Sequence, residues 1–347
     1  MKIAFFVYPS AFQSPGGGEI LLLKTKEALQ AQGVSVTLFN QWEDKLKDFD
    51  ILHVFGSVKD CLGLMSTAKS LGVINVLSPV YWSTLQRALH EHGGLARRSQ
   101  MALQHIAKVV LPVIPSARRK MFLLADSIVP NAQVEADQVS RLFAIPASRM
   151  SVVPLGADEK FAAADPAEFR KKYSLKDFIL SVGRFEPRKN QLNLIRALRG
   201  FNVPLVFIGN PVAEYRSYYE LCKREADPST IFIDRLEHSD TLLASAYAAS
   251  RAFVLQGWFE TPGLVALEAG LAGANLAVTC AGSTREYFKE FVEYLDPADL
   301  HSIRGAVERA LQKDRSQALR AHILGHYLWH HSAECQIRVY KKLLNVK

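Results

Sequence analysis

The feature that most constrains the fold of this chain is an alternation of short hydrophobic runs with longer amphipathic stretches, which occurs twice along the sequence. This alternation is typical of parallel sheets whose strands are joined by helices. In the first half it predicts strands at 2–8, 34–39, 51–55, 73–77, 127–130 and 150–154, and helices at 19–32, 59–71, within 87–111 and at 132–143. In the second half it predicts strands at 178–182, 205–208, 230–234, 252–255 and 275–278, each followed by a helix. The sequence therefore predicts an α/β protein with two Rossmann-like halves.

The length of the chain agrees with two domains. Its 347 residues exceed one ordinary core and fit two domains of roughly 150 residues each. Residues 157–164 are small or charged and suit a linker. Residues 327–347 form an amphipathic stretch that follows another helical stretch with no strand between them. We expect a first domain at 1–160 plus 328–347 and a second at 161–327.

Composition excludes several classes of protein. With 49% hydrophobic and 22% charged residues the chain is a folded globular protein. The longest apolar stretch, 106–114, contains Lys108 and Pro112, so no membrane-spanning helix is expected. The first eight residues read as a buried strand and not as a signal peptide. Four cysteines without Cys-x-x-Cys or metal-ligand spacing favour free thiols in a reducing cytoplasm.

The net charge of +8 is concentrated between residues 87 and 120. Glu91 is the only acidic residue there, against seven basic ones: Arg87, Arg97, Arg98, Lys108, Arg118, Arg119 and Lys120. The stretch lacks interleaved aromatics and any recognised nucleic-acid module, so we expect no nucleic-acid partner. Two interpretations stay open: an amphipathic helix resting on an anionic membrane, or an ordinary helix whose apolar side packs into the core.

The segment 258–270 carries the strongest chemical signal. It follows a hydrophobic strand, turns at Pro-Gly and enters a helix, so the backbone N–H groups of Gly263, Leu264 and Val265 can bind a phosphate. Glu260 precedes this helix and Glu268 lies within it, so the two carboxylates can meet hydroxyls at opposite ends of a diphosphate-linked ligand. The alternative is that Glu260 caps the helix and Glu268 is solvated.

A second candidate segment, 180–190, also runs from a strand through a loop into a helix. Arg184 and Lys189 follow the strand at its carboxyl end, where open α/β sheets bind ligands. Two cations there can neutralise a leaving diphosphate as a metal would; the alternative is a surface charge cluster. The sequence has no Asp-x-Asp and no evident His/carboxylate ligand cluster, so no metal is expected.

Together these segments resemble the retaining glycosyltransferases of family 4, or group 1, which have the GT-B fold. The resemblance covers most of the chain and rests on four elements: Glu-x7-Glu at Glu260 and Glu268, Gly-Arg…Lys-Asn at Gly183, Arg184, Lys189 and Asn190, the run 152–158, and the final helix from 329 to 340. It implies two Rossmann-like domains facing a cleft, with the C-terminal helix returning to the first domain.

The resemblance also implies roles for single residues. Arg184 and Lys189 would bind the donor diphosphate, and Glu260 the hydroxyls of the donor sugar. Glu268 would bind the ribose. The remaining donor contacts would come from the backbone of Gly263, Leu264 and Val265, from Leu236 in the base pocket at 233–237, and from Gly17 and Gly18 in the glycine run 15–18. No cofactor is implied beyond the nucleotide-diphosphate-sugar itself.

Two positions depart from the family pattern. Relatives usually carry a histidine after the fourth strand of the first domain, whereas residues 77–83 read Leu-Ser-Pro-Val-Tyr-Trp-Ser. His53 follows the third strand and is either a substitute or a structural histidine. Pro262 has no N–H, which removes one donor from the sugar cradle.

The predicted function is retaining transfer of a sugar to an acceptor hydroxyl, with the acceptor, a saccharide or a lipid-linked saccharide, on the first domain and the donor on the second. By analogy with relatives we expect a role in surface-glycan assembly, polysaccharide or lipopolysaccharide, in the cytoplasm or peripherally at the inner face of the membrane. A nucleotide-sugar epimerase and a non-catalytic nucleotide-sugar-binding protein are the alternatives.

Overall fold

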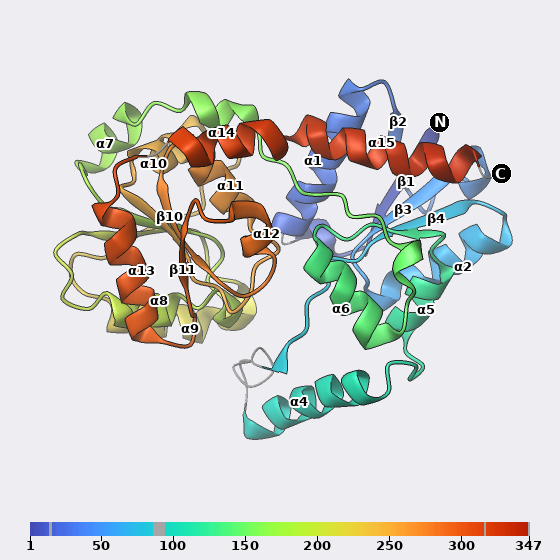
Figure 1. The fold of residues 1–347 in the computed structure, drawn as a ribbon, viewed down its shortest axis with the longest axis horizontal. Helices are drawn as coiled ribbons and strands as arrows, with labels where there is room; N and C mark the ends of the chain where they lie inside the picture. Colours follow the sequence, from blue (N-terminus) through green and yellow to red (C-terminus); the bar gives the residue numbers. More distant parts are fainter. Residues whose placement is uncertain (14–15, 86–93, 316, 346–347) are drawn as a thin grey trace. The chain divides into compact units, whose positions relative to one another are not determined.

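The chain forms two compact units, each with its own parallel sheet (Figure 1). The computed structural model describes residues 1–13, 16–85, 94–315 and 317–345. The first unit comprises Met1–Ala88, Ser99–Gly156 and Trp329–Lys347, and the second consists mainly of Ala157–Leu328. The C-terminal segment therefore belongs to the first unit, although the second lies between them in sequence.

The first sheet has the strand order β2-β1-β3-β4-β5, with every pair parallel. Its strands are β1 (Lys2–Val7), β2 (Ser35–Leu38), β3 (Ile51–Phe55), β4 (Ile74–Ser78) and β5 (Ser127–Ile128). Every residue of β3 and β4 is buried, as strands in the middle of a parallel sheet should be. The direction of strand addition reverses between β1 and β3, so this is the switch point of the first sheet.

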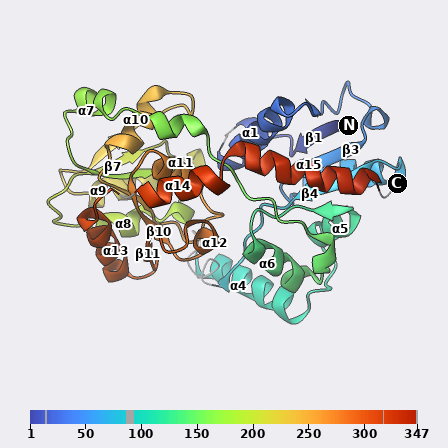
Figure 2. The ribbon, with the colours of Figure 1, turned by 45° about the horizontal axis from the view of Figure 1, so that its top comes forward.

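Helices surround the first sheet (Figure 2). They are α1 (Gly17–Ala31), α2 (Leu62–Ser70), α4 (Leu95–Val110), α5 (Ala117–Leu124), α6 (Gln133–Phe143) and α15 (Trp329–Asn345). Within α4, residues 95–98 group with the second unit and the rest with the first. The C-terminal helix α15 packs along α1, and the Gln32 side chain donates to the His330 carbonyl at 3.0 Å. Helix α1 starts two residues before the predicted Glu19, because the Glu19 carboxylate accepts the Gly16 N–H at 2.7 Å and fixes the first turn around the glycines.

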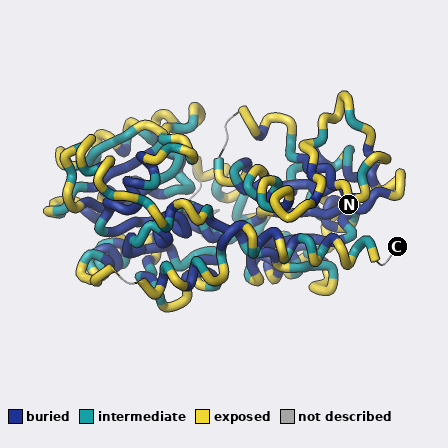
Figure 3. Tube along the Cα trace, turned by 90° about the horizontal axis from the view of Figure 1, so that it is seen from above, coloured by how far each residue is buried: buried dark blue, intermediate teal, exposed yellow. Residues whose placement is uncertain are grey.

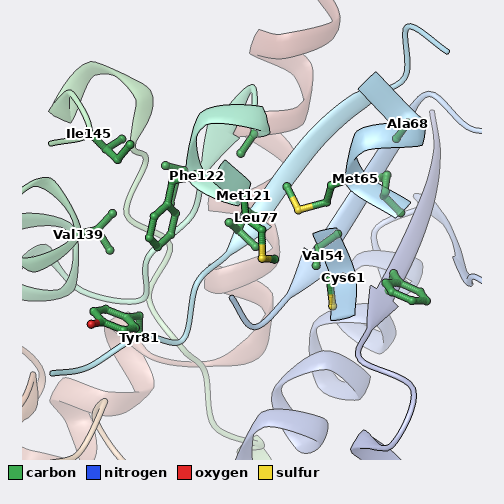
Figure 4. Close-up of a cluster of buried hydrophobic side chains, with 14 of the residues drawn as sticks. Val54, Cys61, Met65, Ala68, Leu77, Tyr81, Met121, Phe122, Val139 and Ile145 are labelled. Atoms are coloured by element: carbon green, nitrogen blue, oxygen red, sulfur yellow. The ribbon is translucent and has the colours of Figure 1, made fainter. Parts of the chain in front are cut away.

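The core of the first unit lies between β3, β4 and the helices α2, α5 and α6 (Figure 4). Met65, Met121 and Phe122 are fully buried there. The Phe122 and Phe143 rings meet at 4.9 Å between centroids in a T-shaped arrangement. This packing holds the carboxyl ends of β3 and β4 in place.

The second sheet has the order β11-β10-β9-β6-β7-β8 and is also parallel throughout. Its strands are β6 (Ile179–Val182), β7 (Leu205–Ile208), β8 (Ile231–Ile233), β9 (Ala252–Leu255), β10 (Asn275–Thr279) and β11 (Glu293–Leu295). The direction of strand addition reverses between β6 and β9. Loops that follow these two strands therefore flank the switch point of the second sheet.

The helices of the second unit cover both faces of this sheet, and buried residues concentrate in the sheets of both units (Figure 3). They are α7 (Ala167–Tyr173), α8 (Gln191–Ala197), α9 (Arg216–Glu225), α10 (Thr241–Ala249), α11 (Leu264–Leu271), α12 (Thr284–Phe288), α13 (Leu300–Gln312) and α14 (Gln317–His326). Short 3-10 turns are η1 (Ala11–Gln13), η2 (Leu46–Asp48), η3 (Lys59–Cys61), η4 (Ala147–Arg149), η5 (Glu159–Ala163), η6 (Pro187–Lys189) and η7 (Ala213–Tyr215). Among the described residues, every helix is too short or too polar to span a bilayer.

The structure corrects one sequence prediction. Residues 150–154 are not a strand: Met150 makes one isolated bridge to Ile128, and the prolines Pro130 and Pro154 lack the N–H groups that a longer ladder needs. Residues 157–164, predicted as a linker, begin at the boundary between the two units. They contain η5 and the fully buried Phe161, whose ring lies 5.7 Å from that of Tyr247. Residues 87–93, the first part of the helix predicted within 87–111, lie outside the described residues, and so does Pro15.

Candidate active site

The candidate site of the second unit lies at the carboxyl ends of β6 and β9. The chain after β6 forms η6, and the chain after β9 leads through Glu260 to helix α11. β6 and β9 are paired neighbours although 73 positions separate Ile179 from Ala252 in sequence. The sheet topology thus brings together the two segments, 180–190 and 258–270, that the sequence marks for chemistry.

An ion pair between Lys189 and Glu260 joins these segments. The Lys189 ammonium donates to Oε1 of Glu260 at 2.7 Å, with the two side chains only 17% and 5% exposed. Burial lowers the pKa of Lys189 from its usual range, and the Glu260 charge opposes that shift. Asn190 fixes the lysine loop, because it adopts a left-handed conformation and its amide donates to the carbonyls of Gln256 and Pro297 at 3.2 and 2.8 Å.

The carboxylate of Glu186 lies among three cations, those of Arg184, Arg188 and Lys189. Arg188 donates to Glu186 at 2.8 Å, and the Arg184 guanidinium lies 3.9 Å from the same carboxylate. Burial alone would raise the pKa of Glu186, but Arg188, Arg184 and Lys189 together lower it below its ordinary value. Arg188 also lies over the Phe259 ring at 5.4 Å. The site therefore holds three cations against two buried carboxylates, those of Glu186 and Glu260.

Two glycines that sequence reasoning missed hold Glu260 in place. The Glu260 carbonyl accepts the N–H of Ser283 at 2.9 Å, and a side chain on Gly282, at φ 103°, would collide with that carbonyl. A Cβ on Gly257 would lie 2.5 Å from Oε1 of Glu260. The only signal in the sequence is that each glycine follows a strand, which glycines in ordinary turns also do.

Helix α11 begins beside the Glu260 carboxylate. Gly263 is its N-cap residue with φ 94°, so Glu260 does not cap the helix and that alternative is wrong. Oε2 of Glu260 lies 3.6 Å from where a Cβ on Gly263 would stand. The first-turn amides of Leu264 and Val265 have no carbonyl partner within the helix, which makes this end of α11 suited to an anion.

Glu268 is buried within α11 and is not a solvated charge. Its Oε1 accepts from Nε2 of His238 at 2.8 Å and its Oε2 from the Tyr247 hydroxyl at 3.0 Å. Burial, and then the Glu268 charge, raise the pKa of Tyr247 well above its usual value. Leu236 is half-buried in the same loop after β8 as His238. Neither His238 nor Tyr247 was expected at the site, since no spacing in the sequence relates them to Glu268.

In the first unit, Gly17 and Gly18 form the first turn of α1, which follows β1 at the switch point of that sheet. A Cβ at either position would meet no atom of the described residues within 4 Å. The backbone beyond both glycines is therefore open, which suits close approach of a ligand. These residues belong to a different unit from Glu260 and Lys189.

His53 is a structural residue and does not substitute for the histidine of the family pattern. It is fully buried, with Nδ1 2.6 Å from the Tyr340 hydroxyl and Nε2 2.9 Å from the Ser78 hydroxyl. Burial lowers its pKa to about 3, so the ring is neutral near pH 7. The chain after β4 instead carries Ser83, whose hydroxyl lies 3.0 Å from Nδ1 of His105 on α4.

The described residues contain no cluster of three or more His, Cys, Asp or Glu side chains arranged to hold a metal ion. What the site offers instead is fixed positive charge, a helix N-terminus and two buried carboxylates. This combination can bind a diphosphate and hydroxyl groups on both sides of it.

Two units with one parallel sheet each, and a C-terminal helix that returns to the first unit, are the features of the GT-B class of fold. Residues 166–323 match the family described as Glycosyl transferases group 1. Among solved structures, the whole chain is similar to sucrose-phosphate synthase from Thermosynechococcus elongatus, with a TM-score of 0.78, 17% identity and 100% of both chains covered. It is also similar to Anabaena HepE in complex with UDP-glucose, with a TM-score of 0.73, 14% identity, and 99% of this chain and 100% of that one covered.

Two sequence relatives are themselves sugar transferases by name. The chain is 27% identical to O-antigen chain mannosyltransferase B of Escherichia coli, over 55% of this chain and 52% of that protein. It is 28% identical to D-inositol 3-phosphate glycosyltransferase of Actinosynnema mirum, over 64% of this chain and 58% of that protein. The matches thus span little more than half the length of either relative.

Proposed function

We propose that the chain is a retaining, metal-independent glycosyltransferase that moves a hexose from a nucleotide-diphosphate-sugar to an acceptor hydroxyl. The observation that carries this proposal is the buried Lys189–Glu260 pair, which stands between the cation cluster after β6 and the N-terminus of α11. A diphosphate bound by Lys189, Arg184 and the α11 amides would leave Glu260 beside the sugar attached to it. The family match of the second unit supports the same assignment.

Each remaining donor contact has a candidate in the structure. Glu268 binds the ribose hydroxyls, with Leu236 and its neighbours lining the base. The backbone of Gly263, Leu264 and Val265 completes the cradle for phosphate and sugar, with one donor fewer because Pro262 lacks an N–H. Gly17 and Gly18 of the first unit let the donor phosphate and the acceptor approach the backbone.

The proposed reaction exchanges one bond at the anomeric carbon for another on the same face. The acceptor oxygen bonds to that carbon as its bond to the diphosphate oxygen breaks, and the acceptor proton passes to the leaving phosphate. Negative charge grows on the diphosphate, so Arg184, Lys189 and the α11 amides stabilise the transition state more than the ground state. Glu260 binds the sugar hydroxyls as positive charge develops on the ring.

The first unit binds the acceptor in this proposal and the second binds the donor. Names of relatives support a setting in surface-glycan assembly, since one of them is an O-antigen mannosyltransferase. The acceptor is then a saccharide or a lipid-linked saccharide, and a lipid-linked acceptor would hold the protein at the inner face of a membrane.

A panel of nucleotide sugars separates this function from its alternatives. A donor that binds raises the melting temperature in proportion to RT ln(1 + [L]/Kd). That donor is then incubated with and without saccharide acceptors, and the anomeric configuration of the product is read by NMR. An α-linked product from an α-linked donor, which the Glu260→Gln protein forms about 100-fold more slowly or slower still, supports retaining transfer.

Three other results would contradict the proposal. An epimerised nucleotide sugar formed without any acceptor would indicate an epimerase of similar fold. Donor binding with neither transfer nor hydrolysis, across all acceptors, would favour a sugar-nucleotide-binding protein. A product of inverted configuration would overturn the retaining mechanism while leaving the donor site intact.

A further inference from the structure

Helix α4 exposes a continuous apolar stripe, which is unusual for a helix of a folded protein. No described residue of α4 is buried. Leu103, Ile106 and Val110 recur at helical spacing, so they share one face, and they are 66%, 46% and 68% exposed. Large apolar side chains on the same face and just after the helix are exposed too: Leu95, Val109, Leu111, Val113 and Ile114. We call these eight residues the α4 stripe.

The side of α4 that carries Met101, His105 and Lys108 is half-buried, whereas the stripe is exposed. Nδ1 of His105 lies 3.0 Å from the Ser83 hydroxyl, and the Lys108 ammonium lies 5.9 Å above the Tyr81 ring and 5.8 Å from that of Phe143. His105 and Lys108 are three residues apart on one side of the helix. In Figures 1 and 2, α4 lies at the periphery of the first unit, near α6. The interpretation of α4 as an ordinary helix that buries its apolar side is therefore wrong.

The charge around the stripe identifies the kind of surface that covers it. From residue 94 to 125 the sequence contains no aspartate or glutamate. Arg97 and Lys120 are exposed, whereas Arg118 and Arg119 donate to the carbonyls of Ser57 and Phe143 at 3.1 Å and serve the fold. Two copies that met through this face would bring like charges together, which opposes a symmetric dimer. An anionic surface with an apolar interior matches both the cations and the stripe.

We propose that the α4 stripe lies on an anionic phospholipid bilayer, with its side chains at the boundary of headgroups and acyl chains and with Arg97 and Lys120 near lipid phosphates. The contact is peripheral and reversible. The biological purpose of this contact rests on the proposed function, because the contact would bring the protein to a lipid-linked acceptor. Binding to lipid itself does not require sugar transfer.

Vesicle co-sedimentation of the full chain tests this surface. At low salt we expect the protein to sediment with phosphatidylglycerol-containing vesicles at least ten-fold more strongly than with pure phosphatidylcholine vesicles. Higher ionic strength should release it as the charges are screened. Leu103→Gln, Ile106→Gln and Val110→Gln together should lower partitioning by at least about ten-fold, since three apolar contacts are lost.

The matched control carries Leu23→Gln, Leu38→Gln and Leu71→Gln, three exposed leucines elsewhere in the first unit, and should sediment like the native protein. Native melting of the stripe variant excludes misfolding as the cause. The proposal is overturned if the stripe variant still binds anionic vesicles fully, or if the native protein does not prefer them to neutral ones. It is also overturned if sedimentation velocity shows a native dimer that the stripe variant abolishes. Donor binding and transfer to a soluble acceptor should be unchanged in the stripe variant. If the native protein itself shows neither activity, the proposed function is wrong, but the lipid-binding proposal is unaffected.

Discussion

Glu260 and Lys189 depend on each other, because each is the partner that makes burial of the other tolerable. Removal of one member of such a buried pair leaves an uncompensated charge and typically costs about 3–5 kcal/mol. A substitution at this pair therefore lowers both the free energy of unfolding and the activity unless it preserves the hydrogen bond. Glutamine at position 260 does so, since its amide oxygen can still accept from the Lys189 ammonium 2.7 Å away.

We expect Glu260→Gln to lower kcat by about 100-fold or more, because a neutral amide no longer stabilises positive charge on the sugar ring. Steady-state kinetics with the donor found by thermal screening measure the effect. Glu290→Gln, at an exposed position of the same unit, should retain native kinetics. If Glu260→Gln melts like the native protein and turns over at a near-native rate, Glu260 does not contact the reacting sugar.

Arg184 offers the cleaner test of diphosphate binding. Its side chain is 37% exposed, and Glu186, which lies 3.9 Å from it, also accepts from Arg188 at 2.8 Å, so Glu186 keeps a cationic partner when Arg184 is removed. Arg184→Ala should weaken nucleoside-diphosphate binding by about 1.5–3 kcal/mol, the range for charged hydrogen bonds, and leave nucleoside binding nearly unchanged. Isothermal titration of both ligands measures this, with the exposed Arg199→Ala as control. Equal losses for nucleoside and diphosphate would remove Arg184 from the phosphate site.

At the scale of elements, the sequence predicts buried strands well because their hydrophobic runs are continuous. The predicted strands at 51–55, 205–208 and 252–255 coincide with β3, β7 and β9. β11 was missed, since Glu-Tyr-Leu at 293–295 has no hydrophobic run and becomes a strand only by pairing with β10 at the sheet edge. For α4 the sequence pattern predicts an apolar side and a basic side, but it does not show which side packs against the rest of the first unit.

The candidate site was predictable in its chemistry but not in its pairing. Residue types and spacing single out Lys189, Glu260 and Glu268. That Lys189 meets Glu260 follows only from the strand order, which makes β9 the neighbour of β6. The contacts of Glu268 with His238 and Tyr247 arise from packing between elements that no local pattern relates.

The loop after β9 gives a test of how finely Glu260 is positioned. Gly257 does not have a positive φ, so alanine fits its backbone, but the added Cβ would lie 2.5 Å from Oε1 of Glu260 and must displace that carboxylate. We expect Gly257→Ala to lower kcat by at least about ten-fold, because a displacement near 1 Å at a reacting group costs rate steeply. Unchanged kinetics would mean that Glu260 tolerates this shift.

The control for this variant is Gly63→Ala on the exposed side of α2, where a Cβ would meet nothing within 4 Å. Alanine there should leave kinetics native and raise the unfolding free energy by up to about 1 kcal/mol, the propensity difference in a helix. Comparison of the two melting curves separates displacement of Glu260 from general loss of stability.

At the scale of the whole molecule, the chain leaves the first unit at Gly156 and returns to it at Trp329. The returning helix α15 is held by buried contacts, among them the 2.6 Å hydrogen bond between Tyr340 and Nδ1 of His53. Two units need not unfold in a single transition, so the stability of each has to be followed separately. The His53 contact provides a pH-dependent marker for the first.

Acid should destabilise the first unit through His53. Burial lowers its pKa from 6.5 to about 3, so between these values the unfolded chain binds a proton that the folded unit excludes. Stability from this group is therefore complete well above pH 6.5 and is lost as the pH falls, by about 2 kcal/mol between pH 7.5 and pH 5.

Urea unfolding of the native protein and of His53→Gln, monitored at both pH values, measures the difference. His53→Gln should be less stable at pH 7.5 but should lose about 2 kcal/mol less on acidification, whereas His301→Gln, at an exposed position, should follow the native protein. Parallel pH dependence in the native and His53→Gln proteins would mean that His53 takes up its proton without unfolding the first unit.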